Sequence, residues 1–284
     1  MSSNKSIQEA KRLIQESDAV LIGAGSGLSA AGGLNYIDPI YFQTHYPGFS
    51  KCGAKNLWEC VGHFWEVNNK NYLQYYAFWA THINNIRYQT EGLQIYKNLY
   101  DLVKNKNYFV ATTNTDGQFY KSGFDATKIF AMQGDYMNFQ CSVPCCQEVF
   151  NNYEMVQRML KNMNHKTMSI QENDVPLCPH CGNFLVPNLR KDELFVEKPN
   201  FVNYPNYMKF LRENENKKLV LLELGVGFNS PGALRIPFEE FVYKIPNWKL
   251  IRINQNDPQF FYRIENRSIV IQEDLNTTIQ EFIK

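Results

Sequence analysis

The sequence predicts an α/β fold in which a Rossmann-like parallel sheet domain carries an inserted smaller domain, made of a zinc ribbon and a helical module. Three observations predict it. Short apolar stretches alternate with helical patterns, glycine or polar residues follow several of these stretches, and four cysteines in two pairs interrupt the alternation. A chain of 284 residues is long enough to form one large domain and one small domain.

The composition is typical of a globular protein and does not favour a polyanionic partner. Hydrophobic residues make up 44% of the chain and charged residues 20%, which excludes a mainly disordered state. Because 29 basic residues balance 28 acidic ones, we expect no nucleic-acid partner. The polar start of the chain and its short apolar runs predict no signal peptide and no membrane contact. We therefore expect a cytoplasmic protein, whose clustered cysteines favour metal ligation over disulfides.

The first elements are a helix, a buried strand and a glycine loop. A capping box at Ser6–Glu9 and apolar residues at helical spacing predict a helix over Ser6–Glu16. The apolar strand Ala19–Ile22 then runs into the loop Gly23–Gly27. Such a loop allows the backbone to approach a pyrophosphate, but Leu28 replaces the third glycine of the dinucleotide fingerprint. The loop alone therefore does not identify a ligand.

The same pattern recurs along the chain. Leu93–Lys104 is expected to be a helix, and Asn203–Lys218 a polar helix. Five further buried strands are predicted, at Tyr108–Ala111, Lys128–Ala131, Leu219–Leu224, Lys249–Ile253 and Ile269–Ile271. Because ligands of parallel sheets bind beyond the carboxyl ends of the strands, the polar residues that follow these strands should face one cleft.

Two segments interrupt this alternation and define the predicted smaller domain. We expect the sheet domain to comprise residues 1–35, 90–135 and 190–284, and the smaller domain residues 36–89 and 136–189. The first inserted segment is rich in aromatic residues, which are more typical of a core than of a binding surface. The second holds five of the seven cysteines.

Four cysteines form the predicted metal site. Paired cysteines at this spacing suit Zn²⁺, which structural sites bind through four thiolates without an open position. The expected ligands are Cys141, Cys145, Cys178 and Cys181. Cys146 remains an alternative to Cys145, since either side chain can reach from one turn. We interpret Cys52, Cys60 and His63 as buried helical residues rather than as a second metal site.

The order of the motifs is more specific than any one of them. Gly23-Ala-Gly25, Thr113-Asn-Thr-Asp-Gly117, Gln133-Gly134, the four cysteines, Gly225-Val-Gly227 and Ile253-Asn254 follow one another, and this order resembles the sirtuin family over nearly the whole chain. The resemblance implies that NAD binds in a cleft between the two domains, as a substrate that loses nicotinamide. It places the cofactor-binding residues at Gly23, Ala24, Gly25, Ser29, Asn114, Asp116, Gly225, Gly227, Asn254 and Asp274.

Two departures from the sirtuin pattern bear on the chemistry. The catalytic histidine of sirtuins falls on Gln133, and an amide cannot act as a general base. The base-assisted step of deacylation should therefore be crippled, whereas displacement of nicotinamide depends more on positioning and electrostatics. The loop Ser29–Tyr36 also lacks the Asp and Arg that sirtuins carry after their glycine motif.

These departures, together with Val186–Arg190, resemble the class M sirtuins, which are associated with macrodomain proteins. That class is described as protein ADP-ribosyltransferases, and its bacterial members modify a lipoylated carrier protein related to the glycine-cleavage H protein. The resemblance thus implies a mono-ADP-ribosyltransferase, with a lipoylated carrier as protein substrate and a macrodomain ADP-ribosyl hydrolase as a candidate partner. It places the catalytic residues at Asn114, Gln133, Asp135 and Arg190.

Each of these residues has an expected role and a plainer alternative. Asn114 is expected to bond the nicotinamide-side ribose, and Gln133 to orient ribose hydroxyls. Asp135 is expected to act as the base or to polarise an acceptor, and Arg190, a fixed cation, to anchor an acidic acceptor side chain or a substrate carboxylate. Asn114 and Asp116 are alternatively turn residues, Asp135 a loop cap and Arg190 a surface ion pair. The competing functions are a deacylase, an NAD glycohydrolase and a catalytically inert NAD-binding protein.

Overall fold

The computed structural model describes residues 3–228 and 231–284. Contacts divide the chain into two compact units. The first, which we call the sheet unit, comprises Met1–Gly33, Gly92–Gln133 and Asn200–Lys284. The second, which we call the cysteine unit, comprises Leu34–Glu91 and Gly134–Pro199. Each unit is described by itself below.

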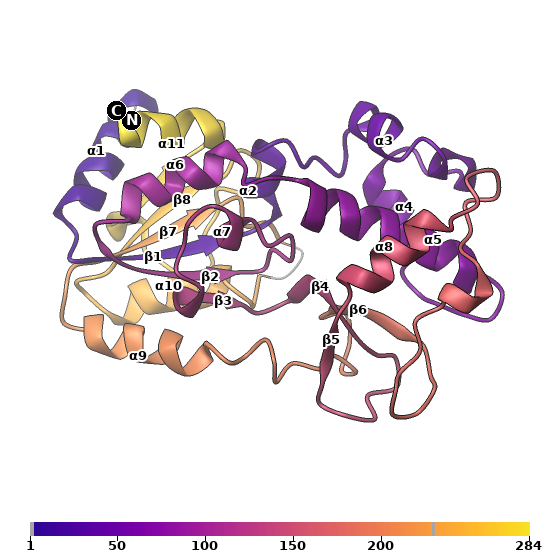
Figure 1. Cartoon of the computed structure of the whole chain (residues 1–284). Coiled ribbons are helices and arrows are strands. Elements are labelled where there is room, and N and C mark those ends of the chain that lie inside the picture. Colours follow the sequence, from indigo (N-terminus) through magenta and orange to yellow (C-terminus); the bar gives the residue numbers. More distant parts are fainter. Residues whose placement is uncertain (1–2, 229–230) are drawn as a thin grey trace. The chain divides into compact units, whose positions relative to one another are not determined.

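The sheet unit is built on a six-stranded parallel sheet (Figure 1). Its strands are β1 (Ala19–Ala24), β2 (Asn107–Thr112), β3 (Ile129–Ala131), β7 (Leu219–Leu224), β8 (Lys249–Ile253) and β9 (Ser268–Ile271). They lie in the order β3-β2-β1-β7-β8-β9, which is the Rossmann order and confirms the predicted fold class. The order reverses between β1 and β7, and in such sheets ligands bind beyond the carboxyl ends of the strands at this point.

Helices cover both faces of this sheet because alternate residues of each strand point to opposite sides. Val20 and Ile22 of β1 pack in one core, and Leu21 packs in the other. The helices of the first core are α1 (Ser3–Glu16), α2 (Ser26–Ala31), α6 (Gln94–Val103) and α11 (Leu275–Ile283). Those of the second are α9 (Tyr204–Asn214) and α10 (Arg235–Lys244). The unit also holds α7 (Gln118–Lys121), η3 (Ala126–Lys128) and η5 (Glu265–Arg267).

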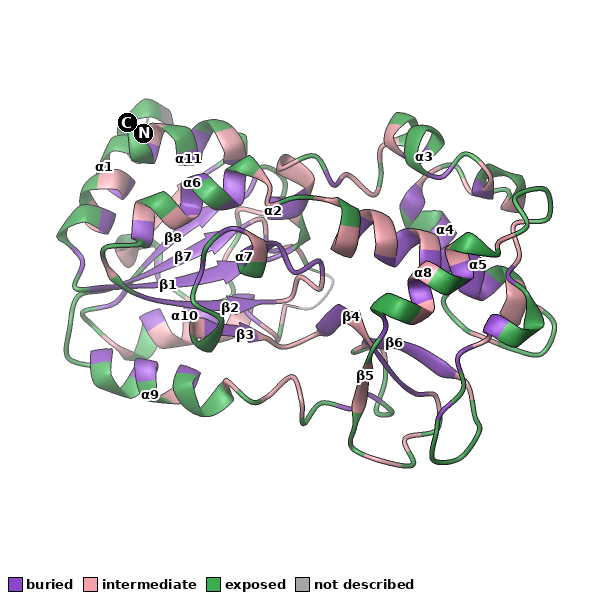
Figure 2. Ribbon diagram, in the orientation of Figure 1, coloured by how far each residue is buried: buried purple, intermediate pink, exposed green. Residues whose placement is uncertain are grey.

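The predicted elements are present, although some end at other residues. Helix α1 begins at Ser3, so the capping box predicted to start the helix at Ser6 is wrong. Glu9 bonds Arg12 three residues further along the helix, which occupies its carboxylate. Most strand residues are buried, as Figure 2 shows for the sheet. Complete burial of a Leu or Ile side chain contributes about 1.5–3 kcal/mol, so these short strands are held mainly by tertiary packing.

The cysteine unit combines a small antiparallel sheet with helices. Its strands are β4 (Gly134–Cys141), β5 (Val149–Asn151) and β6 (Leu185–Leu189), in the order β5-β4-β6. Its helices are α3 (Pro39–His45), η1 (Phe49–Cys52), α4 (Leu57–His63), α5 (Tyr72–Ile83), α8 (Tyr153–Lys161) and η4 (Glu172–Asp174). The segment η2 (Asn84–Gln89) continues α5 as a π-helix, a rare form that often marks functional positions.

Aromatic residues form the core of the cysteine unit. The Phe78 ring on α5 stacks against Phe64 and against the imidazole of His82. The interpretation of the aromatic segment as core therefore holds for α5. It does not hold for Trp58, whose side chain is 57% exposed. Among the described residues, no helix is both long and apolar enough to cross a membrane.

Candidate functional site

The glycine loops after β1 and β7 are interlocked through their backbones. Gly25 N donates to Leu224 O at 3.0 Å, and Gly27 N donates to Gly225 O at 3.1 Å. A Cβ built on Gly25 would lie 2.7 Å from Gly225 O. Gly225 has a φ of +59°, and a Cβ there would lie 2.6 Å from the carbonyl carbon of Gly27. Glycine is required here for the contact between the two loops.

Other predicted cofactor-binding residues have structural contacts as well. A Cβ on Gly23 would lie 2.4 Å from the ring of Phe238, so this glycine gives room to helix α10. Asn254 Nδ2 donates to Val226 O at 2.9 Å, which joins the loops after β7 and β8. Asp274 is exposed and caps helix α11 through Thr277 N at 2.8 Å. The sequence did not show these contacts.

Asn114 and Ser29 belong to a buried hydrogen-bond network beside Gly25. Asn114 Nδ2 donates to Gly25 O and to the hydroxyl of Tyr96, both at 3.0 Å. Ser29 Oγ donates to Asp116 Oδ2 at 2.5 Å and lies 2.6 Å from the Tyr96 hydroxyl. These bonds form one directed chain, from the Asn114 amide through the two hydroxyls to the Asp116 carboxylate.

Tyr96 is the member of this network that sequence reasoning missed. It lies on α6, and its side chain is fully buried. Burial raises the pKa of Tyr96 well above its usual value, and the Asp116 charge raises it further. The phenol therefore keeps its proton and donates a hydrogen bond to Ser29 Oγ. A buried tyrosine in an amphipathic helix is ordinary in a sequence, so no local signal marks it.

The turn that holds Asn114 and Asp116 also has local bonds. Asp116 Oδ1 accepts from Gln118 N at 3.0 Å, and Asn114 N donates to Thr112 Oγ1 at 3.0 Å. Gly117 has a φ of +73°. The plainer alternative, that Asn114 and Asp116 are turn residues, is therefore correct for these local bonds. The same side chains nevertheless reach across to the β1 loop, which a turn does not require.

Gln133 follows strand β3 at the same edge of the sheet. Ala131 pairs with Thr112, so Asn114 and Gln133 each lie two residues beyond a registered pair. The Gln133 side chain is half-buried, and it has no hydrogen-bond partner within residues 3–228 and 231–284. The next residue, Gly134, has a φ of +101°, and a Cβ there would lie 1.9 Å from Asn188 O. Only glycine fits directly after Gln133.

Asp135 lies in the cysteine unit, where it forms an ion pair that the sequence did not predict. Its oxygens accept from Arg87 Nε at 2.8 Å and from Arg87 Nη2 at 3.2 Å. Asp135 Oδ1 also accepts from Met137 N at 2.8 Å. The two side chains are only 11% and 12% exposed. Two hydrogen bonds from one guanidinium fix the orientation of this carboxylate.

Arg190 directly follows strand β6 in the same unit. Its Nη2 lies 2.5 Å from Glu197 Oε2, and its guanidinium stacks over the ring of Phe195 at 4.5 Å. The Arg190 side chain is 35% exposed and that of Glu197 53% exposed. This arrangement matches the surface ion pair that was the plainer alternative. The exposed guanidinium is still accessible to a partner carboxylate.

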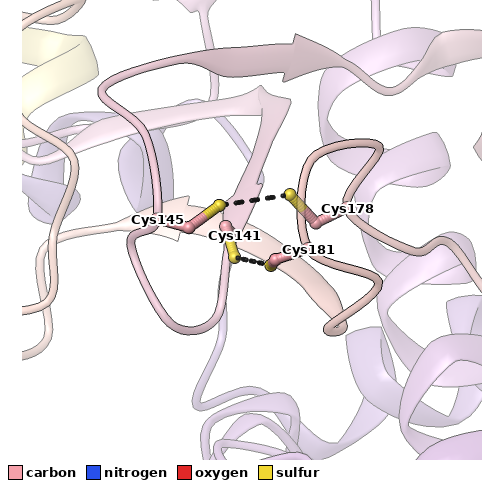
Figure 3. A group of neighbouring side chains, drawn as sticks. All are labelled: Cys141, Cys145, Cys178 and Cys181. Carbon is pink, nitrogen blue, oxygen red and sulfur yellow. Dashed lines mark hydrogen bonds between the residues drawn. The ribbon is translucent and has the colours of Figure 1, made fainter.

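The four predicted zinc ligands come together in the cysteine unit (Figure 3). Their sulfur atoms all lie within 4.8 Å of one another, with Cys141 and Cys181 3.5 Å apart and Cys145 and Cys178 3.6 Å apart. Zinc–sulfur bonds of about 2.3 Å place the sulfurs of a tetrahedral site about 3.8 Å apart. The cluster is therefore compatible with zinc. Asn183 donates backbone and side-chain hydrogen bonds to Cys181 and lowers the pKa of this thiol to about 6.

The other cysteines are placed differently. Cys146 lies outside the four-cysteine cluster, close to Glu148 and His180. His180 Nε2 lies 2.9 Å from Glu148 Oε2, and both side chains are exposed. Cys60 is buried, and its sulfur lies 3.9 Å from that of Cys52. In the described part of the chain these two cysteines do not form a metal-ligating group with His63.

The sheet order, the glycine loops and the cysteine cluster define a Rossmann-type α/β protein with a second unit whose four cysteines are compatible with a zinc ribbon. A protein ADP-ribosyltransferase of Staphylococcus aureus is 30% identical over 279 residues, which cover 97% of this chain and 86% of that protein. A probable bifunctional ADP-ribose hydrolase/ADP-ribosyltransferase of Fusarium oxysporum is 32% identical over 258 residues, which cover 87% of this chain but 42% of its own length. The chain belongs to the protein ADP-ribosyltransferase family. No family model matches it.

Solved sirtuin structures share the fold. A Sir2 homologue in complex with NAD is 12% identical, with a TM-score of 0.58, over 97% of this chain and 92% of that one. Sir2Tm bound to a propionylated peptide is 16% identical, also with a TM-score of 0.58, over 96% of this chain and 95% of that one. The curated relatives thus confirm the predicted family and enzyme class, protein ADP-ribosyltransferase, and the solved structures confirm the predicted sirtuin-like fold.

Proposed function

We propose that this enzyme transfers a single ADP-ribose from NAD to a protein acceptor and releases nicotinamide. The observation that carries the proposal is the buried network of Asn114, Tyr96, Ser29 and Asp116. It lies beside the glycine loops at the point where the strand order reverses. Polar side chains that are ordered before a ligand arrives cost little reorganisation during the reaction.

The proposed step exchanges one bond for another. The bond between ribose C1′ and the nicotinamide nitrogen breaks, and C1′ forms a bond with a nucleophilic atom of the acceptor. Nicotinamide leaves with the bonding electrons, and the acceptor loses its proton to solvent or to a nearby base. Asn114 would bond the ribose, and the Asp116 carboxylate would stabilise positive charge that develops at C1′.

Gln133 supports transfer in preference to deacylation. Its amide has no proton equilibrium near neutral pH and can only donate and accept hydrogen bonds. We propose that it orients ribose hydroxyls, while Asp135 and Arg190 of the cysteine unit bind the acceptor. The ion pair with Arg87 favours positioning over base catalysis at Asp135.

We propose a lipoylated carrier protein, related to the glycine-cleavage H protein, as the acceptor. We also propose a macrodomain ADP-ribosyl hydrolase as a partner that removes the modification. The name of the fungal relative supports the second proposal, because it joins hydrolase and transferase in one protein. A cluster of four reduced thiols suits a reducing compartment, which supports a cytoplasmic location.

The deciding experiment is an incubation with NAD and a lipoylated carrier protein, followed by mass spectrometry of all products. We expect one ADP-ribose on the carrier and free nicotinamide. Free ADP-ribose alone would mean that the enzyme is a glycohydrolase, and acyl-ADP-ribose from an acylated peptide would mean that deacylation survives. Asn114→Ala should strongly slow the transfer, whereas Asn69→Ala, which replaces an exposed asparagine of the cysteine unit, is the matched control.

We further propose that the four-cysteine cluster binds one structural Zn²⁺. Cys178→Ser should lower the zinc content of the purified protein from one equivalent to a small fraction, measured by elemental analysis. Cys146→Ser is the control and should keep the metal, because Cys146 lies outside the cluster. Full zinc in Cys178→Ser would contradict the ligand assignment.

A further inference from the structure

The cysteine unit contains a cavity that the proposed reaction does not use. Its volume is about 330 Å³, at the lower end of the range of small-molecule sites. The 3₁₀-helix η1, the start of α5 and the loop 164–169 contribute lining residues. Three of these residues are lysines, Lys51, Lys70 and Lys166, each from a different segment.

The cavity also has an apolar wall. Phe49 and Phe64 line it, and their rings meet edge to face with centroids 6.0 Å apart. Both belong to the aromatic core, being only 2% and 5% exposed. Met168 completes this wall. The lining therefore combines aromatic rings and a thioether with lysine side chains.

Hydrogen-bonded turns hold the segments that present the lysines. Asn68 Oδ1 accepts from Lys70 N at 2.9 Å, and Asn71 Oδ1 accepts from Asn68 N at 2.9 Å. Asn164 Oδ1 accepts from Lys166 N at 3.0 Å. The Lys51 segment is a short 3₁₀-helix that ends at Gly53, whose φ is +87°. The backbone positions of the three cations are therefore fixed before any ligand binds.

Met168 has an uncommon backbone conformation at this wall. Among the described residues it is the one non-glycine residue with positive φ, at +48°. A Cβ on Gly48 would lie 2.3 Å from Met168 Sδ, so the thioether packs directly against the Gly48 backbone. Left-handed conformations of non-glycine residues cost free energy and tend to occur at binding sites. Here the conformation places an apolar side chain in the cavity wall.

The charges around the cavity are unbalanced. No Asp or Glu is among the lining residues, and His63 adds a further basic group. Within the described ranges, none of the three lysines forms an ion pair, although Lys191 and Lys104 in the same protein do. Basic groups that line one cavity without a carboxylate repel one another and attract anions.

We propose that this cavity binds a small organic carboxylate, with its apolar body against Phe49, Phe64 and Met168 and its carboxylate between the lysines. Such a ligand can contact the apolar residues and pair with the lysines at once. Inorganic phosphate can pair only with the lysines, and a neutral alcohol can contact only the apolar residues. The site is separate from the ADP-ribosyl transfer proposed above and does not depend on it.

Binding of octanoate to the full-length protein, measured by isothermal titration calorimetry, tests the proposal. Octanol, acetate and inorganic phosphate are the comparison probes. We expect saturable binding of octanoate and at least tenfold weaker binding of the other three. The triple variant Lys51→Met, Lys70→Met, Lys166→Met keeps the apolar stems and should weaken octanoate binding at least tenfold. Lys55→Met, an exposed lysine of the same unit outside the cavity, should leave it unchanged.

Cys52 offers a second readout, because it lines the cavity and is partly exposed. Octanoate should slow the alkylation of Cys52 by iodoacetamide, measured by peptide mass spectrometry, without slowing that of Cys146. Octanoate that fails to bind, or that binds the triple variant equally well, would overturn the proposal. Phosphate that binds as tightly as octanoate would overturn the assigned role of the apolar wall. Urea unfolding followed by circular dichroism verifies that the triple variant is folded.

Discussion

Two buried carboxylate clusters lie at the same edge of the parallel sheet, and different partners stabilise them. Glu223 on β7 and Glu239 on α10 both bond Arg252 on β8, and all three side chains are fully buried. Near β1 and β2, the Ser29 hydroxyl and the Gln118 backbone N–H donate hydrogen bonds to Asp116. In the first cluster the charged side chains pair with one another and also bond backbone groups of the chain. The second ends in side chains that can exchange their hydrogen bonds with a ligand.

This difference separates a cluster that stabilises the fold from one suited to chemistry. Glu239 Oε2 accepts from Tyr262 N at 3.0 Å, and so fixes the loop after β8. Breaking such a set leaves charges buried without partners, which is costly. Replacing one neutral donor in the Asp116 network costs less stability but removes a group that we propose bonds the reacting ribose.

The largest expected effect is on the ion-paired cluster. Arg252→Met should lower the free energy of unfolding by about 3–5 kcal/mol, because it leaves Glu223 and Glu239 buried without their cation. Urea unfolding followed by circular dichroism measures this. Arg12→Met removes an exposed arginine with two carboxylate partners and should leave the midpoint unchanged. Equal effects of the two substitutions would remove the distinction between the clusters.

The second prediction concerns the Asp116 network. Asn114→Ala should lower the rate of ADP-ribosyl transfer by about 10²–10³-fold, the usual effect of losing one oriented donor. Because Asn114 is a neutral member of the network, the unfolding midpoint should move far less than in Arg252→Met. Initial rates and urea unfolding of the same preparation compare the two. If Asn114→Ala unfolded as readily as Arg252→Met and yet kept its activity when folded, the Asp116 network would serve stability and not the reaction.

The third prediction concerns a buried histidine of the cysteine unit, His82, and its effect on how stability depends on pH. Burial lowers the pKa of His82 to about 3, from about 6.5 in an unfolded chain. Between these values only the unfolded chain takes up the proton, so the free energy of unfolding falls as the pH falls below 6.5 and is unaffected by His82 above it. The neutral ring bonds the hydroxyls of Tyr36 and Tyr46.

The expected loss between pH 7 and pH 5 is about 2 kcal/mol from His82 alone. Urea unfolding at both pH values measures it, and His82→Gln removes this titration from the difference. If the variant lost as much stability on acidification as the parent, the pH dependence would arise from other groups.

The smallest expected effect is that of Tyr96→Phe. It removes one hydroxyl from the chain between Asn114 and Asp116 and should cost about 1 kcal/mol of stability. The KM for NAD should rise several-fold, because Ser29 and Asn114 lose their shared partner, while kcat changes less. Tyr100→Phe on the same helix is the control, since Tyr100 lies outside this network. Identical kinetics of the two variants would exclude Tyr96 from the site.

The sequence predicted most of the sheet unit because its strands carry local signals. Each strand is a short apolar run bounded by glycine or polar residues, and strand-end polar residues such as Asn114 and Asp116 do reach the β1 loop. The spacing of the cysteine pairs was an equally clear signal. The structure places Cys145, and not Cys146, in the four-cysteine cluster.

The hydrogen-bond partners of the predicted site residues could not be predicted, because they come from distant parts of the sequence. Arg87 lies 48 positions from Asp135, and Tyr96 lies 67 positions from Ser29. Neither stands in a motif, and a π-helix has no sequence pattern as clear as the helical repeat. The contact of Gly23 with Phe238 likewise depends on how α10 packs against β1. Local periodicity identifies elements, and packing decides which side chains meet.

The interlocked glycines after β1 and β7 have a consequence for engineering this enzyme. Gly25, Gly27 and Gly225 touch through backbone atoms, so neither loop can gain a side chain at the contact without displacing the other. A loop transplanted from another nucleotide-binding protein would therefore have to be exchanged together with its counterpart, although some 200 positions of sequence separate them. In directed evolution the two loops should accordingly change as a single cassette, with library diversity introduced around the glycines and never at them.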